Sequence, residues 1–247
     1  MNTNSASLSA ADQKLNEILK ISKENSAKKL RTLCVFDLDS TLFNVSTRTQ
    51  RIITEFAEIH QLEQLKSVEV LAADWGIKEA VIRAGLHPEK HPEILKKLRD
   101  YWFEHFFSNE YLHYDVPYPG SIAFVVELSA TGAEIIYLTG RDQHRMAMGT
   151  KEVLIKWGFP FSDQHLVLKP HRTMDDESYK RDWFNSFDRS QYAKIYFFEN
   201  EPVNVNAVLN TYSDIEVVYL DTTHSRKQNV TEKIFKIPHF LRRTRDN

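Results

Sequence analysis

The stretch LCVFDLDSTL, residues 33–42, decides the fold of this chain. Four apolar residues end abruptly in two carboxylates, Asp37 and Asp39, and two hydroxyl side chains, Ser40 and Thr41, follow them. The apolar run is bounded by polar residues and is too short for a helix, so it predicts a buried strand of a parallel sheet. Side chains two residues apart on a strand point to the same side, so we expect Asp37 and Asp39 to converge at its carboxyl end.

These two acids predict chemistry at the end of the strand. Two carboxylates this close repel each other unless a cation or a shared proton relieves the repulsion. The carboxyl ends of strands are also where open α/β sheets bind ligands. Asp37 and Asp39 therefore indicate Mg²⁺ binding, acid–base chemistry or both. The alternative interpretation is a simple turn after a strand, because Asp, Ser and Thr are common turn and cap residues.

The rest of the chain alternates short apolar strands with helical segments. Such alternation predicts an α/β fold with a Rossmann-like, doubly wound parallel sheet. We expect further strands at 134–138, 165–168, 195–198 and 215–220, and helices at 122–128, 143–157, 177–187 and 203–209.

Two segments lie outside this alternation. One carries apolar side chains at helical spacing and predicts an all-helical insertion with a small core of its own. The other is N-terminal: residues 1–8 are small and polar and predict disorder, and Ser9 with Asp12 then resembles a capping box that opens a helix packed on the body. The expected organisation is an N-terminal helical extension, an α/β core in two pieces and a helical insertion: 1–28, 29–45 with 116–247, and 46–115.

Composition excludes several classes of protein. The chain has 247 residues, is 42% hydrophobic and has a formal net charge of −2, which argues against a general nucleic-acid binder despite a locally basic C-terminal stretch. Its single cysteine, Cys34, excludes a disulfide framework. No apolar run approaches the length of a membrane span, and no signal peptide is evident, so we expect a soluble, cytoplasmic protein without membrane association. The oligomeric state is left open.

Polar side chains follow four of the expected strands. They are Asp37 with Asp39, Thr139, Lys169, and Glu199 with Asn200. Because each strand is apolar until its end, we expect these groups to gather along one edge of the sheet.

At these residues the chain resembles the haloacid dehalogenase-like (HAD) hydrolase superfamily. Its first motif, D-x-D-x-T, matches residues 37–41, and its second, an apolar strand ending in Ser or Thr, matches Thr139. Its fourth motif, D-D-x-P-x-N, corresponds to residues 199–204. The resemblance covers about residues 30–45 and 116–221 and implies a phosphatase branch with a helical C1-type cap formed by the insertion.

The resemblance implies a role for each acid at the site. Asp37 is the expected nucleophile that forms an aspartyl-phosphate, and Asp39 the expected proton donor and acceptor. Mg²⁺ is the expected cofactor. Its expected ligands are Asp37, the backbone carbonyl of Asp39, and the Glu199/Asn200 pair. Asn200 replaces one of the family's two acids, so we expect weaker Mg²⁺ binding than two aspartates would give.

The remaining expected site residues contact the phosphate or the substrate. Thr139 should donate a hydrogen bond to a phosphoryl oxygen. A lysine should neutralise the phosphate, and both Lys169 and Lys180 are candidates, with Lys180 favoured by its place at a helix start. The expected substrate-binding residues are Ser40, Thr41, Gly140 and Arg141.

These features predict a Mg²⁺-dependent phosphomonoester hydrolase that acts on a small phosphorylated metabolite. One alternative is a nucleotide or nucleic-acid end phosphatase that uses the basic C-terminal stretch and the aromatic residues of the insertion. A second is a HAD-like protein with weakened catalysis that binds a partner or phospho-ligand, as the altered fourth motif suggests.

Overall fold

The computed structural model describes residues 8–231 and 233–244, and its centre is a six-stranded sheet. The strand order is β5-β4-β1-β6-β7-β8, and each neighbouring pair is parallel. The predicted α/β class and doubly wound parallel sheet are therefore confirmed. The strands are β1 (Arg31–Phe36), β4 (Glu134–Asp142), β5 (Leu166–Lys169), β6 (Tyr192–Glu199), β7 (Ile215–Leu220) and β8 (Phe235–Ile237).

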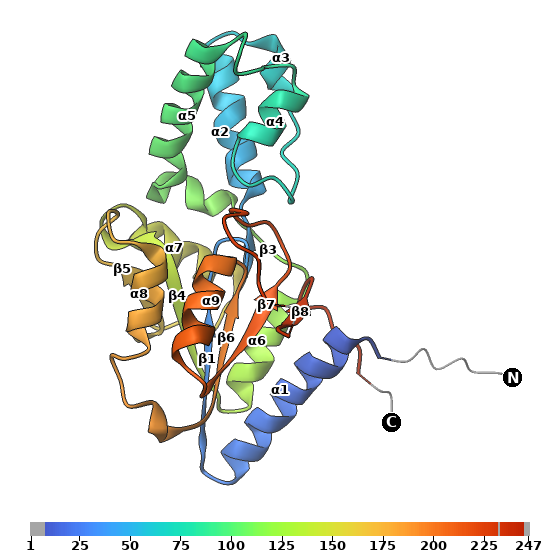
Figure 1. Ribbon diagram of the computed structural model, residues 1–247, viewed down its shortest axis with the longest axis vertical. Coiled ribbons are helices and arrows are strands. Elements are labelled where there is room, and N and C mark those ends of the chain that lie inside the picture. The colour runs from blue at the N-terminus through green and yellow to red at the C-terminus, as the bar shows by residue number, and fades with distance from the viewer. Residues whose placement is uncertain (1–7, 232, 245–247) are drawn as a thin grey trace, which may run out of the picture.

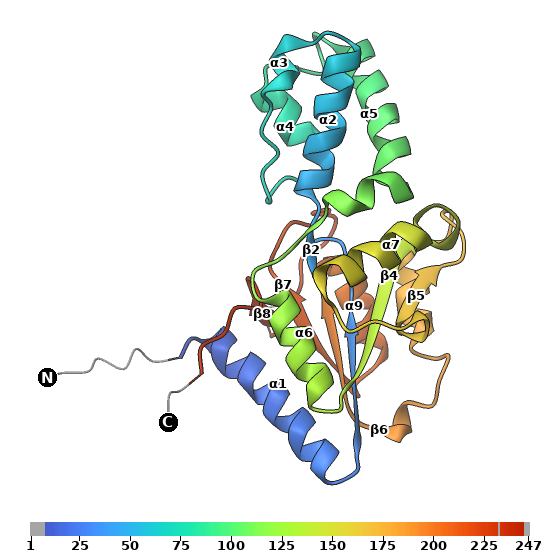
Figure 2. The same ribbon diagram turned by 180° about the vertical axis from the view of Figure 1, so that it is seen from behind.

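Helices cover both faces of the sheet (Figure 1, Figure 2). Cys34 and Phe36 of β1 pack into a cluster with α1, α6 and α7, whereas Leu33 and Val35 pack into a cluster with α8 and α9. A strand buried on both faces needs apolar residues at successive positions, which explains the continuous apolar run. The covering helices are α1 (Ala10–Ala27), α6 (Ser121–Ala130), α7 (Gln143–Trp157), α8 (Asp176–Trp183) and α9 (Pro202–Thr211).

The N-terminal helix α1 begins with a reciprocal cap. Ser9 Oγ accepts a hydrogen bond from the backbone N–H of Asp12, and the Asp12 carboxylate accepts one from the backbone N–H of Ser9. The apolar stripe of the helix is buried in the core cluster, as predicted. The expected disorder of residues 1–8 concerns, apart from Leu8, residues outside the described part of the chain.

Residues 46–115, here called the helical module, stand above the carboxyl edge of the sheet (Figure 1). Side chains such as Phe56, Val81 and Leu98 form its own buried cluster. The chain enters and leaves it beside a two-stranded antiparallel ribbon of β2 and β3. The elements are β2 (Phe43–Asn44), α2 (Ser46–Ile59), α3 (Glu63–Lys66), α4 (Lys78–Arg83), α5 (Pro92–Phe106), the 3₁₀ helix η1 (Asn109–Tyr114) and β3 (Val116–Pro117).

Two strands differ most from the prediction; in addition, β6 begins at Tyr192 instead of residue 195, and α8 ends at Trp183 instead of residue 187. β4 continues to Asp142 instead of stopping at residue 138, because Asp142 pairs with Lys169 of β5 after an irregularity in the ladder. The basic C-terminal stretch contributes β8, whose Ile237 is fully buried. Short 3₁₀ helices precede two other strands, η2 (Asp163–His165) and η3 (Arg189–Gln191).

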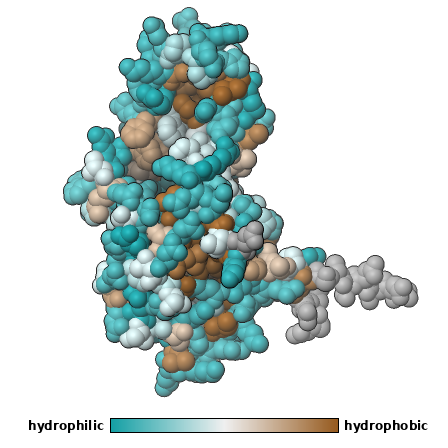
Figure 3. Space-filling model, in the orientation of Figure 1, coloured by the Kyte–Doolittle hydropathy of each residue, from teal (hydrophilic) through white to brown (hydrophobic). Residues whose placement is uncertain are grey.

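Hydrophilic residues cover most of the face in Figure 3, with apolar patches on both the helical module and the sheet domain. Among the helices that the structure describes, none combines the length and the apolar character of a candidate membrane span.

Candidate active site

Asp37 lies directly after β1 and lines a cavity of about 250 Å³ that is formed by the sheet edge and the helical module. Its backbone N–H donates to the carbonyl oxygen of Phe198 on β6 at 3.0 Å, so the neighbouring strand fixes its position. Its Oδ1 accepts a hydrogen bond from Lys180 Nζ at 2.5 Å. Lys180 also donates to Glu199 Oε2 at 2.7 Å, which joins three buried charges.

This group carries one excess negative charge, because Lys180 is shared by two carboxylates. Burial penalises the ionised carboxylate and Glu199 repels it, which raises the pKa of Asp37 to about 7 although Lys180 opposes the shift. Burial also works against the charge of Lys180, but Asp37 and Glu199 outweigh it and raise the pKa of the ammonium. The group therefore has a deficit of positive charge that a bound cation would relieve.

Glu199, at the end of β6, is held from four directions. Its Oε1 accepts the backbone N–H groups of Asn200 and Glu201, both at 2.9 Å. Its Oε2 accepts Asn204 Nδ2 at 3.1 Å in addition to Lys180. Both oxygens are thus engaged within the protein, so Glu199 has less capacity left for a metal than Asp37 has.

Ser40 and Thr41, both expected to bind substrate, are placed differently. Ser40 lines the cavity. Thr41 is fully buried and donates from Oγ1 to Asn200 Oδ1 at 3.0 Å, while Asn200 Nδ2 donates to the Thr223 carbonyl at 2.7 Å. Thr41 therefore orients Asn200, which lines the cavity. Thr41 itself is not part of the described cavity lining.

Two arginines hold Asp39. Its Oδ1 accepts Arg141 Nη2 at 2.5 Å, Arg141 Nε at 3.1 Å and Arg48 Nη2 at 2.8 Å. Burial works against ionisation, but both guanidinium groups outweigh it and hold the pKa of Asp39 well below its usual range. No hydrogen bond from the described residues reaches Asp39 Oδ2, so this oxygen is available to a ligand in the cavity.

Asp115, between η1 and β3, completes a buried network of four charges. Arg48 donates to it twice, from Nε at 2.8 Å and from Nη2 at 2.9 Å, and Arg141 Nη2 donates at 2.6 Å. The side chains of Arg48, Arg141 and Asp115 are at most 1% exposed. With Asp39 the formal charges balance, and the network joins the helical module to the ribbon and the sheet.

Arg48 and Asp115 were not singled out by the sequence. Charged residues are almost never fully buried unless they are paired, and the partners here lie far apart in the chain. The available signal was that Arg48 stands four residues before the buried Ile52, on the apolar side of α2. Arg141, expected to bind substrate, does line the cavity, but its guanidinium is already bound to Asp39 and Asp115.

Thr139 and Gly140 reach the cavity from β4. The Thr139 hydroxyl accepts the backbone N–H of Arg141 at 3.2 Å, and its own proton is left to donate to a ligand. A Cβ atom on Gly140 would lie 2.7 Å from Asp176 Oδ2, so a larger residue here would have to displace the Asp176 carboxylate.

The two candidate lysines lie in different surroundings. Lys180 lies in the last turn of α8 and not at the helix start as expected; it lines the cavity and contacts Asp37. Lys169, at the end of β5, donates to Asp176 Oδ1 at 2.5 Å and to the carbonyl of Met174 at 3.0 Å. Lys169 is not part of the described cavity lining, although Asp176, to which its ammonium is bonded, is.

The acids and amides of this site fit a magnesium ion. Mg²⁺ prefers oxygen ligands, uses one or two carboxylates and keeps waters or substrate phosphate as its other ligands. Asp37 has the excess negative charge and an oxygen without a hydrogen bond from the described residues, and Asn200 presents an amide beside it. In the described part of the chain, no three or more His, Cys, Asp or Glu residues are grouped so that they could hold a metal ion by themselves. A magnesium site in which water and substrate phosphate supply the other ligands does not need such a group.

Comparison with known proteins identifies the fold. No protein-family model matches the chain, and no curated protein matches it significantly. Its structure is similar to a HAD-superfamily hydrolase of subfamily IA, variant 1, from Geobacter sulfurreducens PCA, with a TM-score of 0.50 and 10% identity over 85% of this chain and 93% of that one. The predicted resemblance to the HAD superfamily is thus confirmed for the fold.

Two further solved structures are similar at lower scores. A predicted phosphoglycolate phosphatase from Haemophilus somnus 129PT has a TM-score of 0.49 and 14% identity, over 85% of this chain and 95% of that one. A class C acid phosphatase from Bacillus anthracis has a TM-score of 0.43 and 16% identity over 82% of this chain. The chain spans 66% of the length of that acid phosphatase, which is just under two thirds.

Proposed function

We propose that this chain is a Mg²⁺-dependent phosphomonoester hydrolase that uses Asp37 as its nucleophile and acts on a small phosphorylated metabolite. The proposal rests on the convergence of Asp37, Asp39 and Thr139 on one cavity at the carboxyl edge of a HAD-like sheet. Lys180, bonded to Asp37, supplies the cationic group that such a reaction requires. The direct test is the hydrolysis of p-nitrophenyl phosphate by the purified protein.

In the first step Asp37 attacks phosphorus in line with the leaving oxygen. The bond from phosphorus to that oxygen breaks, its electron pair goes to the oxygen, and Asp39 donates a proton to it. In the second step Asp39 takes a proton from water, the resulting hydroxide attacks the aspartyl-phosphate, and inorganic phosphate leaves with Asp37 restored. Thr139 and Lys180 bind the phosphoryl oxygens while charge builds up on them.

Asp37, the Asp39 carbonyl and Asn200 would hold the magnesium ion, and Glu199, whose oxygens already accept four hydrogen bonds, would contribute less than Asp37. When bound, Mg²⁺ supplies the positive charge that lets an anionic carboxylate approach an anionic phosphoryl group. Lys180 keeps Asp37 and Glu199 from repelling each other before substrate arrives.

The arginine pair that holds Asp39 has two effects on its proposed role. It fixes one oxygen of the carboxylate, so that the other serves both proton transfers from one position. It also favours the ionised form of Asp39, which suits the base role of the second step and works against the acid role of the first. The first step therefore places the greater demand on this residue.

The helical module is proposed to act as a C1-type cap that excludes water from the reaction. The ribbon connects the module to the core through the chain itself. Two further contacts join the module to the loop after β7. Thr223 Oγ1 donates to the Ala73 carbonyl at 3.1 Å, and Arg226 pairs with Glu79 at 2.9 Å. These contacts join the module to the core on the side of the cavity that Thr223 lines.

Removal of divalent cations with EDTA is expected to abolish hydrolysis of p-nitrophenyl phosphate, and excess Mg²⁺ should restore it. Because Asn200 offers a neutral oxygen, the Asn200→Asp variant should reach half-maximal activity at an about tenfold lower Mg²⁺ concentration. Full activity in EDTA would contradict the metal requirement. If calorimetry detects no Mg²⁺ binding and no ester of a panel of phosphate esters is hydrolysed, the hypothesis of a HAD-like binding protein is favoured over that of an enzyme.

The two lysines are expected to differ sharply on substitution. Lys180→Met should lower kcat/KM for p-nitrophenyl phosphate by about 100-fold or more, because it removes the cation that contacts the nucleophile. Lys169→Met, the matched control, should stay within about threefold of the parent, since Lys169 is itself outside the described cavity lining and bonds to Asp176 instead of Asp37. Circular dichroism shows whether both variants fold. A larger loss in Lys169→Met than in Lys180→Met would contradict the assignment.

A further inference from the structure

The helical module contributes an aromatic wall to the cavity, formed by Trp75, Trp102, Phe106 and Phe107. Trp102 is fixed by a hydrogen bond from its Nε1 to Thr49 Oγ1 at 3.2 Å and by ring contacts with Phe106 and Phe107 at 4.6 and 6.2 Å between centroids. Trp75 is 51% exposed, although it lies at the cavity. An aromatic wall of this kind binds flat rings by stacking and edge contacts.

The charges of the cavity do not suit a second anionic group on the substrate. Of the described residues that line it, the two cations are Arg141 and Lys180, and six are carboxylates. Arg141 is bonded to Asp39 and Asp115, and Lys180 faces Asp37, where the phosphoryl group would bind. A carboxylate or second phosphate on the leaving group would therefore find no free cation and several acids.

The carboxylates away from Asp37 do not call for a cationic substrate either, because each has partners. Asp74 is bonded to both terminal nitrogens of Arg83, at 2.8 and 2.5 Å. Asp176 is bonded to Lys169 at 2.5 Å. Glu201 keeps its charge, but each of its oxygens accepts a hydrogen bond from Ser225, at 2.8 and 2.6 Å. The part of the cavity beyond the phosphoryl site thus suits a neutral group.

From this combination we infer that the substrate is a phosphomonoester whose alcohol part is uncharged and carries a flat aromatic ring. The inference rests on the proposed phosphatase function and names its substrate class. The cavity volume of about 250 Å³ lies just below the range of about 300–1,000 Å³ typical of ligand pockets, which favours a small ester. Both a simple aryl alcohol and a nucleoside have this chemistry.

Three esters with similar primary leaving groups test the inference by kcat/KM at saturating Mg²⁺: benzyl phosphate, cyclohexylmethyl phosphate and 4-carboxybenzyl phosphate. Because the reacting oxygen is alike in all three, differences report on recognition of the ring. The kcat/KM of benzyl phosphate should be about tenfold higher than that of cyclohexylmethyl phosphate, because the aromatic wall contacts a flat ring. It should be at least about tenfold higher than that of 4-carboxybenzyl phosphate, because the added carboxylate meets acids in the cavity. Uridine 5′-monophosphate is the fourth substrate: a kcat/KM above that of benzyl phosphate would identify the alcohol part as a nucleoside, and a lower one as a simple aromatic alcohol.

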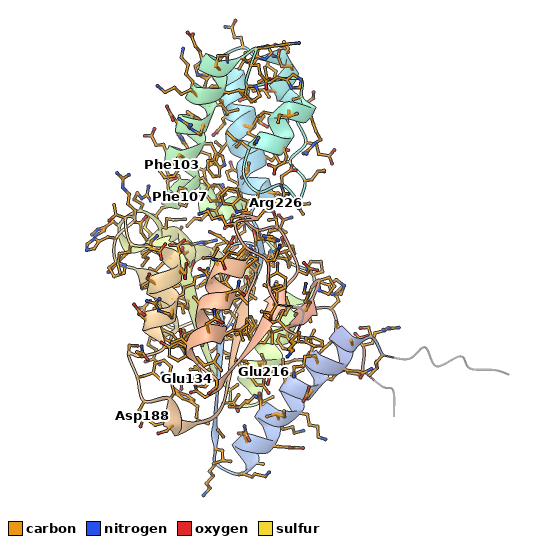
Figure 4. All side chains as sticks on the ribbon, in the orientation of Figure 1. Phe103, Phe107, Glu134, Asp188, Glu216 and Arg226 are labelled. Carbon is orange, nitrogen blue, oxygen red and sulfur yellow. The ribbon has the colours of Figure 1, made fainter. Side chains whose placement is uncertain are left out.

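Variants of the wall provide a second, independent readout. Trp75→Leu and Phe107→Leu should bring the ratio of benzyl to cyclohexylmethyl hydrolysis close to one. Phe103→Leu is the matched control: Phe103 lies near Phe107 at the lower end of the module in Figure 4, with ring centroids 4.9 Å apart, but it is outside the described cavity lining. Its ratio should equal that of the parent. Partial unfolding does not change these ratios, because it affects both substrates equally.

Each outcome bears on a different claim. Equal hydrolysis of the benzyl, cyclohexylmethyl and carboxybenzyl esters overturns the inference and leaves the phosphatase proposal standing. A preference that persists unchanged in both wall variants overturns the assignment of the aromatic wall. No hydrolysis of any ester overturns the proposed function, and this inference falls with it.

Discussion

Replacing Asp37 with Asn is expected to lower phosphomonoester hydrolysis at least about 1,000-fold while the protein stays folded. The amide keeps the shape of the side chain but is not a nucleophile, so no covalent intermediate can form. Stability should not fall, because Asp37 is the source of the excess negative charge that Lys180 shares with Glu199. Steady-state kinetics and the midpoint of thermal unfolding measure the two effects separately.

An unchanged or higher unfolding midpoint in Asp37→Asn would show that the loss of activity is chemical and does not result from misfolding. A stabilised but inactive protein is also what a strained active site leads one to expect. Robust hydrolysis by Asp37→Asn would end the proposed mechanism, since every step of it passes through this carboxylate.

Replacing Asp115 with Asn is expected to destabilise the protein by about 3–5 kcal/mol. Asp115 is fully buried and accepts hydrogen bonds from both Arg48 and Arg141, so its neutralisation leaves two buried guanidinium groups with Asp39 as their remaining carboxylate. The cost of an uncompensated buried charge exceeds that of any surface ion pair. Unfolding in urea, analysed by linear extrapolation, gives the change in free energy.

The matched control for Asp115 is Asp163→Asn, which breaks an exposed ion pair. Asp163 bonds to Lys151 at 2.7 Å, but the two side chains are 82% and 48% exposed, so the loss should stay below about 1 kcal/mol. Equal effects of the two substitutions would contradict the view that the network is a desolvated, mutually dependent unit. Asp115→Asn should also lower activity in the folded protein, because Arg48 and Arg141 position Asp39.

The sequence by itself determined the layered α/β architecture and the location of the acids. Apolar runs such as residues 33–36 can be buried on both faces only in a parallel sheet covered by helices, and parallel strands deliver the residues after them to one edge. Asp37, Asp39, Thr139 and Asn200 are placed on one cavity by this rule alone. The capping box at Ser9 is equally local, and it was predicted for the same reason.

The tertiary structure alone decided which charged residues pair. Lys180 and Lys169 were both candidates in the sequence, with Lys180 favoured, but only the packing of α8 decides that one ammonium contacts Asp37 and the other Asp176. Arg48 and Asp115 are 67 positions apart and meet only because the ribbon closes the helical module onto the sheet. Hydrophobic periodicity records which side of an element is buried, whereas the partner of a buried charge depends on distances across the whole fold.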